Sequence, residues 1–159
     1  MDDSEATELA DDDELIDDLL RALGDNRDAG LESDRRAREK LGVGRNDFAV
    51  VRFLVEADRR GVSLTPGEIA LALGVSTAAT TALVDRLETV GLVRRERNPT
   101  DRRSVIVRAA LAEGSQERRI AMTRDAAERR AIAALPVRDR RVVLRALEQI
   151  TDAVRRDGH

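Results

Sequence analysis

Cysteine is absent from the sequence, and histidine occurs once, as the last residue, His159. Without cysteine the chain can form no disulfide and cannot sense oxidants through a thiol. Zinc sites usually draw on Cys and His, and His is the commonest acid–base catalyst. No phosphate-cradling glycine loop of the GxxxxGK(S/T) or GxGxxG type occurs either. We therefore predict no metal, no cofactor and no enzyme activity, with carboxylate chemistry as the remaining enzymatic alternative.

Long apolar runs are also absent. No run approaches the ~20 residues that span a bilayer, and the N-terminus lacks the basic-then-apolar pattern of a secretion signal. We therefore expect a soluble cytoplasmic protein without a membrane partner. With 159 residues, 42% of them hydrophobic, the chain can fill one core, and we predict a single domain.

Lysine is nearly absent too, since Lys40 is the only one, and the charge is unevenly spread. The first twenty residues hold ten acids and no bases, a charge of −10, whereas the whole chain has a net charge of −3. The other 139 residues therefore carry +7. Because guanidinium groups present forked donors, this arginine-rich body is suited to phosphate.

Apolar spacing predicts helices on both sides of the central segment. Residues 13–23 place leucine and isoleucine three and four apart, and we expect this helix to end at Gly24, before a weaker helical segment over 27–41. A second helix is predicted over 46–60. After Gly114 a long helical stretch should run to Ala134. The last helix has an apolar seam of Val143, Leu147, Ile150 and Val154. That seam fits either an ordinary core stripe or a dimer interface, and we favour the interface.

The segment from Thr65 to Val93 predicts a helix-turn-helix. Thr65 and Glu68 have the spacing of a capping box with Pro66 at the first helical position, so a helix should begin here. Gly74 can turn the chain out of that helix, and Ser76 can cap the next one, which carries Leu83, Val84, Leu87 and Val90 inward. An αα-hairpin used only for packing is the structural alternative.

A β-hairpin is predicted directly after this helix pair. Leu92-Val93 and Val105-Ile106-Val107 flank an Asn-Pro-Thr-Asp turn that lies between two arginine clusters. A hairpin in this position is the wing of a winged helix, and arginines at its tip suit the negative potential of a narrow minor groove. The alternative is a solvated charged hairpin.

From about Val43 to Val107 the sequence resembles the MarR-type winged-helix transcriptional regulators. The resemblance is strongest in LVDRLE, GLVRR and DRR at these spacings. It implies a recognition helix from Ser76 to Leu87, in which Ser76, Thr77, Ala78, Thr80 and Thr81 meet DNA. It also implies minor-groove contacts by Arg102 and Arg103, a salt bridge from Asp101 that orients the wing arginine, and an Arg86 that contacts the phosphate backbone or braces the wing.

The resemblance further implies a homodimer through the N-terminal helix and the last two helices. Small organic effectors commonly bind the family between these helices and the winged lobe, and Phe48, Val51 and Arg52 are the candidate pocket here. The fold prediction is mainly α with a small antiparallel β-wing. It divides the chain into a flexible acidic start (1–12), dimerisation helices (about 13–45 and 115–159) and a winged helix-turn-helix lobe (about 46–112).

The predicted function is that of a sequence-specific DNA-binding transcriptional regulator. We expect a homodimeric repressor that binds double-stranded DNA at a palindromic operator and responds to a small organic ligand. The alternatives are a constitutive DNA-binding protein without an effector and a winged helix used as a protein-interaction module.

Overall fold

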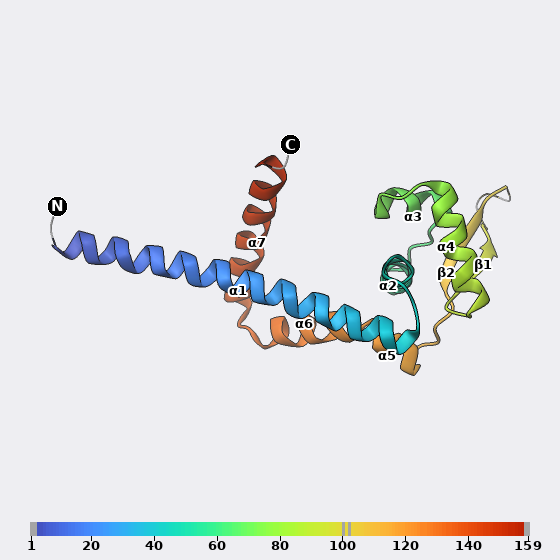
Figure 1. The fold of residues 1–159 in the computed structure, drawn as a ribbon, viewed down its shortest axis with the longest axis horizontal. Helices are drawn as coiled ribbons and strands as arrows, with labels where there is room; N and C mark the ends of the chain where they lie inside the picture. The colour runs from blue at the N-terminus through green and yellow to red at the C-terminus, as the bar shows by residue number, and fades with distance from the viewer. Residues whose placement is uncertain (1–2, 100, 102, 158–159) are drawn as a thin grey trace. The chain divides into compact units, whose positions relative to one another are not determined.

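The computed structural model describes residues 3–99, 101 and 103–157 of the chain. It is mainly helical with one two-stranded antiparallel sheet, which confirms the predicted fold class (Figure 1). The elements in chain order are α1 (Asp3–Leu41), α2 (Arg45–Arg59), α3 (Pro66–Leu73), α4 (Thr77–Thr89), β1 (Val93–Arg97), β2 (Val105–Ala109), α5 (Gln116–Ala121), α6 (Thr123–Ala134) and α7 (Val137–Asp157).

The chain divides into two compact units, one up to Met122 and one from Thr123 onward. The core lies in the first unit, around helix α2. The buried face of α2 holds Phe48, Val51, Leu54 and Val55, and apolar residues of α3, α4 and both wing strands pack with it. Removing each large side chain from water contributes roughly 1.5–3 kcal/mol. The largest of these fully buried apolar side chains are Val50, Val51, Leu54, Val55, Ile69, Val84, Leu87, Val93 and Val107.

The predicted helix end at Gly24 is wrong, because helix α1 continues without a break to Leu41. A glycine inside a helix costs only about 1 kcal/mol relative to alanine, so it need not end one. Ion pairs between neighbouring turns support the charged half of the helix, with Arg35 bound to both Glu32 and Glu39. The chain leaves the helix at Gly42, whose φ is 67°. The helix includes residues 3–12, and the flexibility expected of this acidic start stays a prediction.

The helical stretch predicted after Gly114 is divided in two. Ser115 caps α5 by accepting a hydrogen bond from the backbone N–H of Arg118 at 3.1 Å, and α5 ends at Ala121 with Met122 as its C-cap. Helix α6 follows at once, and α7 begins after Pro136 as expected. Within the described part of the chain no single helix is long and apolar enough to cross a membrane, although the bent pair of α3 and α4 reaches that length when the two are counted together.

An ion-pair cluster lies at the C-terminal end of α2. The carboxylate of Glu56 accepts hydrogen bonds from Arg59 at 2.7 Å and from Arg60 at 2.6 Å. The hydrogen bond from Arg59, aided by that from Arg60, lowers the pKa of Glu56 to about 2, against the opposing effect of its partial burial. The carboxylate of Glu56 is therefore charged at neutral pH and can pair with both arginines.

Candidate nucleic-acid interface

The predicted helix-turn-helix is formed by α3 and α4. The hydroxyl of Thr65 accepts a hydrogen bond from the N–H of Glu68 at 3.3 Å, and the carboxylate of Glu68 accepts one from the N–H of Thr65 at 2.7 Å. The Glu68 carboxylate also accepts from the Thr65 hydroxyl at 2.8 Å, and the hydrogen bonds from the backbone N–H and the hydroxyl of Thr65 lower the pKa of Glu68. Gly74 ends α3 with a φ of 64°, and the Ser76 hydroxyl caps α4 by accepting from the N–H of Ala79 at 3.2 Å. The chain bends by 111° between the two helices, which matches the range of helix-turn-helix units.

Helix α4 has one buried and one exposed face. Leu83, Val84 and Leu87 are buried as predicted, but Val90 is 63% exposed, because α4 ends at Thr89 and Val90 lies at its C-cap. Thr80 shares the buried face: its side chain is 0% exposed, and its hydroxyl donates to the carbonyl oxygen of Ser76 at 3.1 Å. The prediction that Thr80 meets DNA is therefore wrong, because the side chain is inside the protein.

The exposed face at the start of α4 carries the other predicted contact residues. Its members are Ser76, Thr77, Ala78 and Thr81. The Thr81 hydroxyl donates to the carbonyl oxygen of Thr77 at 3.0 Å, so its oxygen still presents lone pairs outward. These short side chains allow a close approach to a flat partner surface.

The predicted hairpin forms the wing. Strands β1 and β2 pair antiparallel from Val93↔Ala109 to Arg97↔Val105. The edge of β2 is held by Leu64, whose carbonyl oxygen accepts from the N–H of Val107 at 2.7 Å. In the turn, the Asn98 amide donates to the Ser104 hydroxyl at 2.7 Å.

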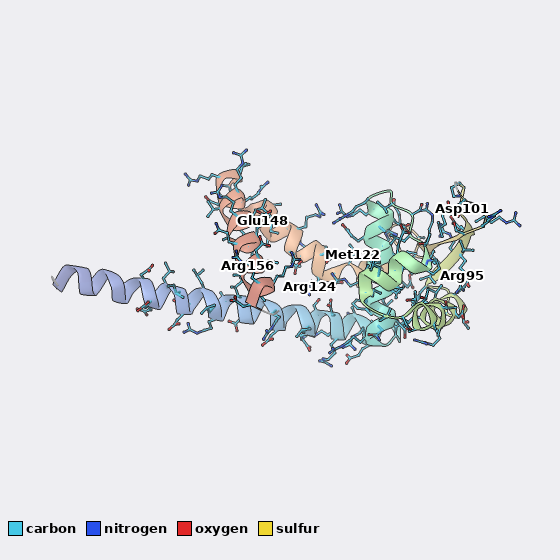
Figure 2. All side chains as sticks on the ribbon, turned by 90° about the horizontal axis from the view of Figure 1, so that it is seen from above. Arg95, Asp101, Met122, Arg124, Glu148 and Arg156 are labelled. Carbon is cyan, nitrogen blue, oxygen red and sulfur yellow. The ribbon has the colours of Figure 1, made fainter. Side chains whose placement is uncertain are left out.

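At the tip of the wing, the carboxylate of Asp101 accepts from the backbone N–H of Arg103 at 2.9 Å (Figure 2). Asp101 thus fixes the turn through the backbone of Arg103, and the salt bridge that the resemblance implies stays a prediction. Arg103 is exposed, and Arg102 lies outside the described residues. Whether either arginine meets DNA stays a prediction.

Arg86 does not brace the wing, which was one of its two predicted roles. Its guanidinium donates to the carboxylate of Asp47, on α2, at 2.9 Å, and more weakly to the carbonyl oxygen of Ala82 at 3.4 Å. The side chain is still 59% exposed. Its contact with phosphate stays a prediction.

Arg95 braces the wing instead, and the sequence analysis missed it. From the middle of β1, its guanidinium donates to the carboxylates of Glu88 and Asp85 on α4, the latter at 2.6 Å, and its backbone N–H donates to Glu88 at 3.0 Å. Burial opposes the charge on Arg95, but the hydrogen bonds with Glu88 and Asp85 outweigh it and raise the pKa. The available signal was a pair of acids one helical turn apart, followed by arginine.

The residues predicted to line an effector pocket are packed or paired within the described part of the chain, and an effector pocket at this place stays a prediction. Phe48 and Val51 are packed in the core, and Arg52 donates to both carboxylate oxygens of Asp34, on α1, at 3.1 Å. An open polar depression of about 390 Å³ lies elsewhere. It is lined by Asp58, Arg94, Arg108, Ala109, Leu111, Ala112, Glu113 and Arg118. Among the described residues no cluster of His, Cys, Asp and Glu could hold a metal.

Residues 41–104 match the family model described as MarR family, and this stretch covers both helices of the helix-turn-helix and most of the wing. This segment belongs to the MarR family. The resemblance found in the sequence is thereby confirmed for the lobe. Because the MarR-family neighbours are transcriptional regulators, the match also agrees with the prediction that the chain is not an enzyme.

Known proteins of the same kind match over different lengths. The uncharacterized HTH-type transcriptional regulator YcgE of Bacillus subtilis (strain 168) is 42% identical over 71 residues, which cover 45% of this chain and 44% of that protein. The chain thus matches less than half the length of this relative. The crystal structure of the YusO protein from Bacillus subtilis is similar with a TM-score of 0.56 and 25% identity, over 89% of this chain and 97% of that one.

A DNA complex is among the similar structures. A mutant of MepR from S. aureus, bound to an oligodeoxyribonucleotide, has a TM-score of 0.53 and 18% identity, over 87% of this chain and 97% of that chain. At that identity the likeness shows the fold alone. It extends beyond the MarR segment into the flanking helices, because the matched share of the chain is larger than the winged lobe.

Proposed function

We propose that this chain is a cytoplasmic, homodimeric transcriptional repressor of the MarR type that binds a palindromic DNA operator and responds to a small organic ligand. The observation that carries the proposal is the exposed polar face of α4 beside an arginine-bearing wing. Hydroxyls and methyl groups of that size can reach base edges in a major groove.

In this proposal α4 enters the major groove, and the wing meets the adjacent minor groove. Ser76, Thr77, Ala78 and Thr81 supply short donors, acceptors and methyl groups to base edges and phosphates. Arg103, with Arg102 as the resemblance implies, supplies positive charge where the minor groove concentrates negative potential. Arg86 has an exposed guanidinium on the same helix for a phosphate.

The proposed dimer is supported by apolar helix faces that the single chain leaves exposed. In α7 the residues of the predicted seam are between 40% and 69% exposed. In α1 the predicted apolar face is exposed as well, at Leu15, Ile16, Leu19 and Leu20. Large apolar faces of this kind are covered by a partner in soluble proteins. A two-fold dimer would place two recognition helices about one DNA turn apart, hence the palindromic operator.

The proposed effector is a small anion, and the polar depression at the base of the wing supports it. Arg94 and Arg118 each donate to a backbone carbonyl oxygen, of Ala109 at 3.0 Å and of Leu111 at 3.2 Å respectively. A guanidinium has five N–H donors, so these side chains can also bind a carboxylate. Small organic acids should therefore raise the melting temperature of the protein, and Arg118→Gln should reduce that shift. An effector must also change operator affinity, by about 5–150-fold at typical coupling.

Binding-site selection from genomic DNA fragments tests the main proposal. The purified protein should enrich a small set of fragments that share an inverted repeat. Arg103→Gln should weaken binding to operator and random DNA alike and lower the salt dependence by about one unit of slope. No enrichment, together with a partner protein captured through α4, would favour the protein-interaction module. Enrichment without a responding acid would favour the constitutive DNA-binding protein.

A further inference from the structure

Both strands of the wing contact the rest of the lobe at the same residue pair of the sheet, Arg95↔Val107. On the β2 side, the N–H of Val107 donates to the carbonyl oxygen of Leu64. On the β1 side, Arg95 reaches Asp85 and Glu88 of α4. Leu64 precedes the helix pair, but the acids belong to the helix that would read DNA. Arg95 is thus a direct link between wing and recognition helix.

The side chain of Arg95 is directed to this link rather than to solvent. It is 27% exposed, against 52% for Arg94, the preceding residue on the strand. A guanidinium that joins two carboxylates is a geometrically demanding contact, since its donors lie in one rigid plane. The base of β1 is already fixed to α4, because the N–H of Leu92 donates to the carbonyl oxygen of Leu87 at 2.9 Å. The Arg95 contacts therefore act further out and limit how far the hairpin can swing about its base.

We infer that Arg95 is a positioning residue that locks the wing to the recognition helix, so that both elements meet DNA as one rigid unit. The inference rests on the proposed DNA binding for its consequence. It implies that a contact at the wing tip is effective only while Arg95 holds the wing. Arg95 itself needs no contact with DNA for this role.

A double-mutant cycle on DNA affinity tests the coupling. Arg103→Gln should weaken binding about 5–10-fold in the wild-type background but less than about 2-fold in an Arg95→Gln background, because coupled residues have non-additive effects. The double variant Asp85→Asn/Glu88→Gln breaks the same contacts while removing two negative charges. In that background too, Arg103→Gln should have almost no further effect on DNA affinity. Arg97→Gln is the matched control, since it removes the same charge from the same strand, and its effect should add to that of Arg103→Gln.

If Arg103→Gln costs the same factor in all backgrounds, Arg95 does not position the wing, and the inference fails. A uniform factor would result if Arg95 only bound phosphate or only stabilised the fold. Urea unfolding and circular dichroism of each variant check that it is folded.

Amide hydrogen exchange tests the lock without DNA. The amides of β1 should exchange faster in Arg95→Gln and in the Asp85/Glu88 double variant, but not in Arg97→Gln, while the amides of α2 stay protected. Unchanged exchange in β1 would overturn the inference whatever the protein binds. If the wild type binds no DNA, the proposed function fails. Amide hydrogen exchange alone then tests whether Arg95 holds the wing against α4.

Discussion

Two adjacent threonines of the recognition helix should respond to substitution in opposite ways. The hydroxyl of Thr80 is buried and donates to the carbonyl oxygen of Ser76, which also accepts from the N–H of Thr80 at 2.9 Å. Thr80→Val removes the hydroxyl and leaves that carbonyl one donor, so we expect a loss of about 0.5–1.5 kcal/mol in unfolding free energy. Thr80→Ala also removes a methyl group, which adds at least ~0.8 kcal/mol.

Thr81 is exposed, so Thr81→Val should change stability by less than about 0.5 kcal/mol. If its hydroxyl contacts a base edge, the preferred DNA sequence should change by roughly 1–3 kcal/mol at one position. Urea unfolding measures the first effect, and selection from randomised DNA measures the second. The reasoning is refuted if Thr80→Val alters the selected sequence at unchanged stability, or if Thr81→Val destabilises the protein as much as Thr80→Ala does.

Three further predictions concern the dimer, acid stability and the start of α3. Leu147→Asp/Ile150→Asp should sediment as a folded monomer, whereas Arg145→Asp, on the same helix, should remain a dimer; a dimeric double variant would place the interface elsewhere. The folded-state pKa of Glu56 is about 2 and its ordinary value 4.5, so its stabilising effect is present above pH 4.5 and is lost as the pH falls toward 2. Glu56→Gln should therefore be less stable than the wild type by up to about 1 kcal/mol at neutral pH, with a difference that shrinks across that window in acid titrations of stability. Thr65→Ala should cost about 1 kcal/mol in urea unfolding, because the cap of α3 is lost, and an unchanged midpoint would mean that the capping box contributes nothing.

Signals confined to a few neighbouring residues predicted the winged lobe well. The capping box at Thr65, the left-handed Gly74 and the Ser76 cap each depend on residues at most three positions apart, so the bounds of α3 and the start of α4 followed from the sequence. The hairpin did as well, since the apolar segments Leu92-Val93 and Val105-Ile106-Val107 flank a proline-containing turn.

The wrong predictions concern which way a side chain faces and which residues it contacts, and not which helices and strands form. Thr80 lies three, four and seven residues before Leu83, Val84 and Leu87, and helical spacing alone places it on their buried face. Its hydroxyl suggests a contact with DNA, but its position on the helix buries it. The link from Arg95 to Glu88 and Asp85 was not predictable with the same security, because it requires the angle at which the wing leaves α4.

The length of α1 has an electrostatic consequence for the whole lobe. At 1.5 Å per residue, the helix from Asp18 to Leu41 is about 35 Å long. Physiological salt screens exposed charges beyond about 8 Å, so the field of the acidic end fades along the helix within a fraction of that length. A chain that is acidic as a whole can therefore still have a basic surface where its lobe faces phosphate groups. Its isoelectric point says little about its affinity for a polyanion.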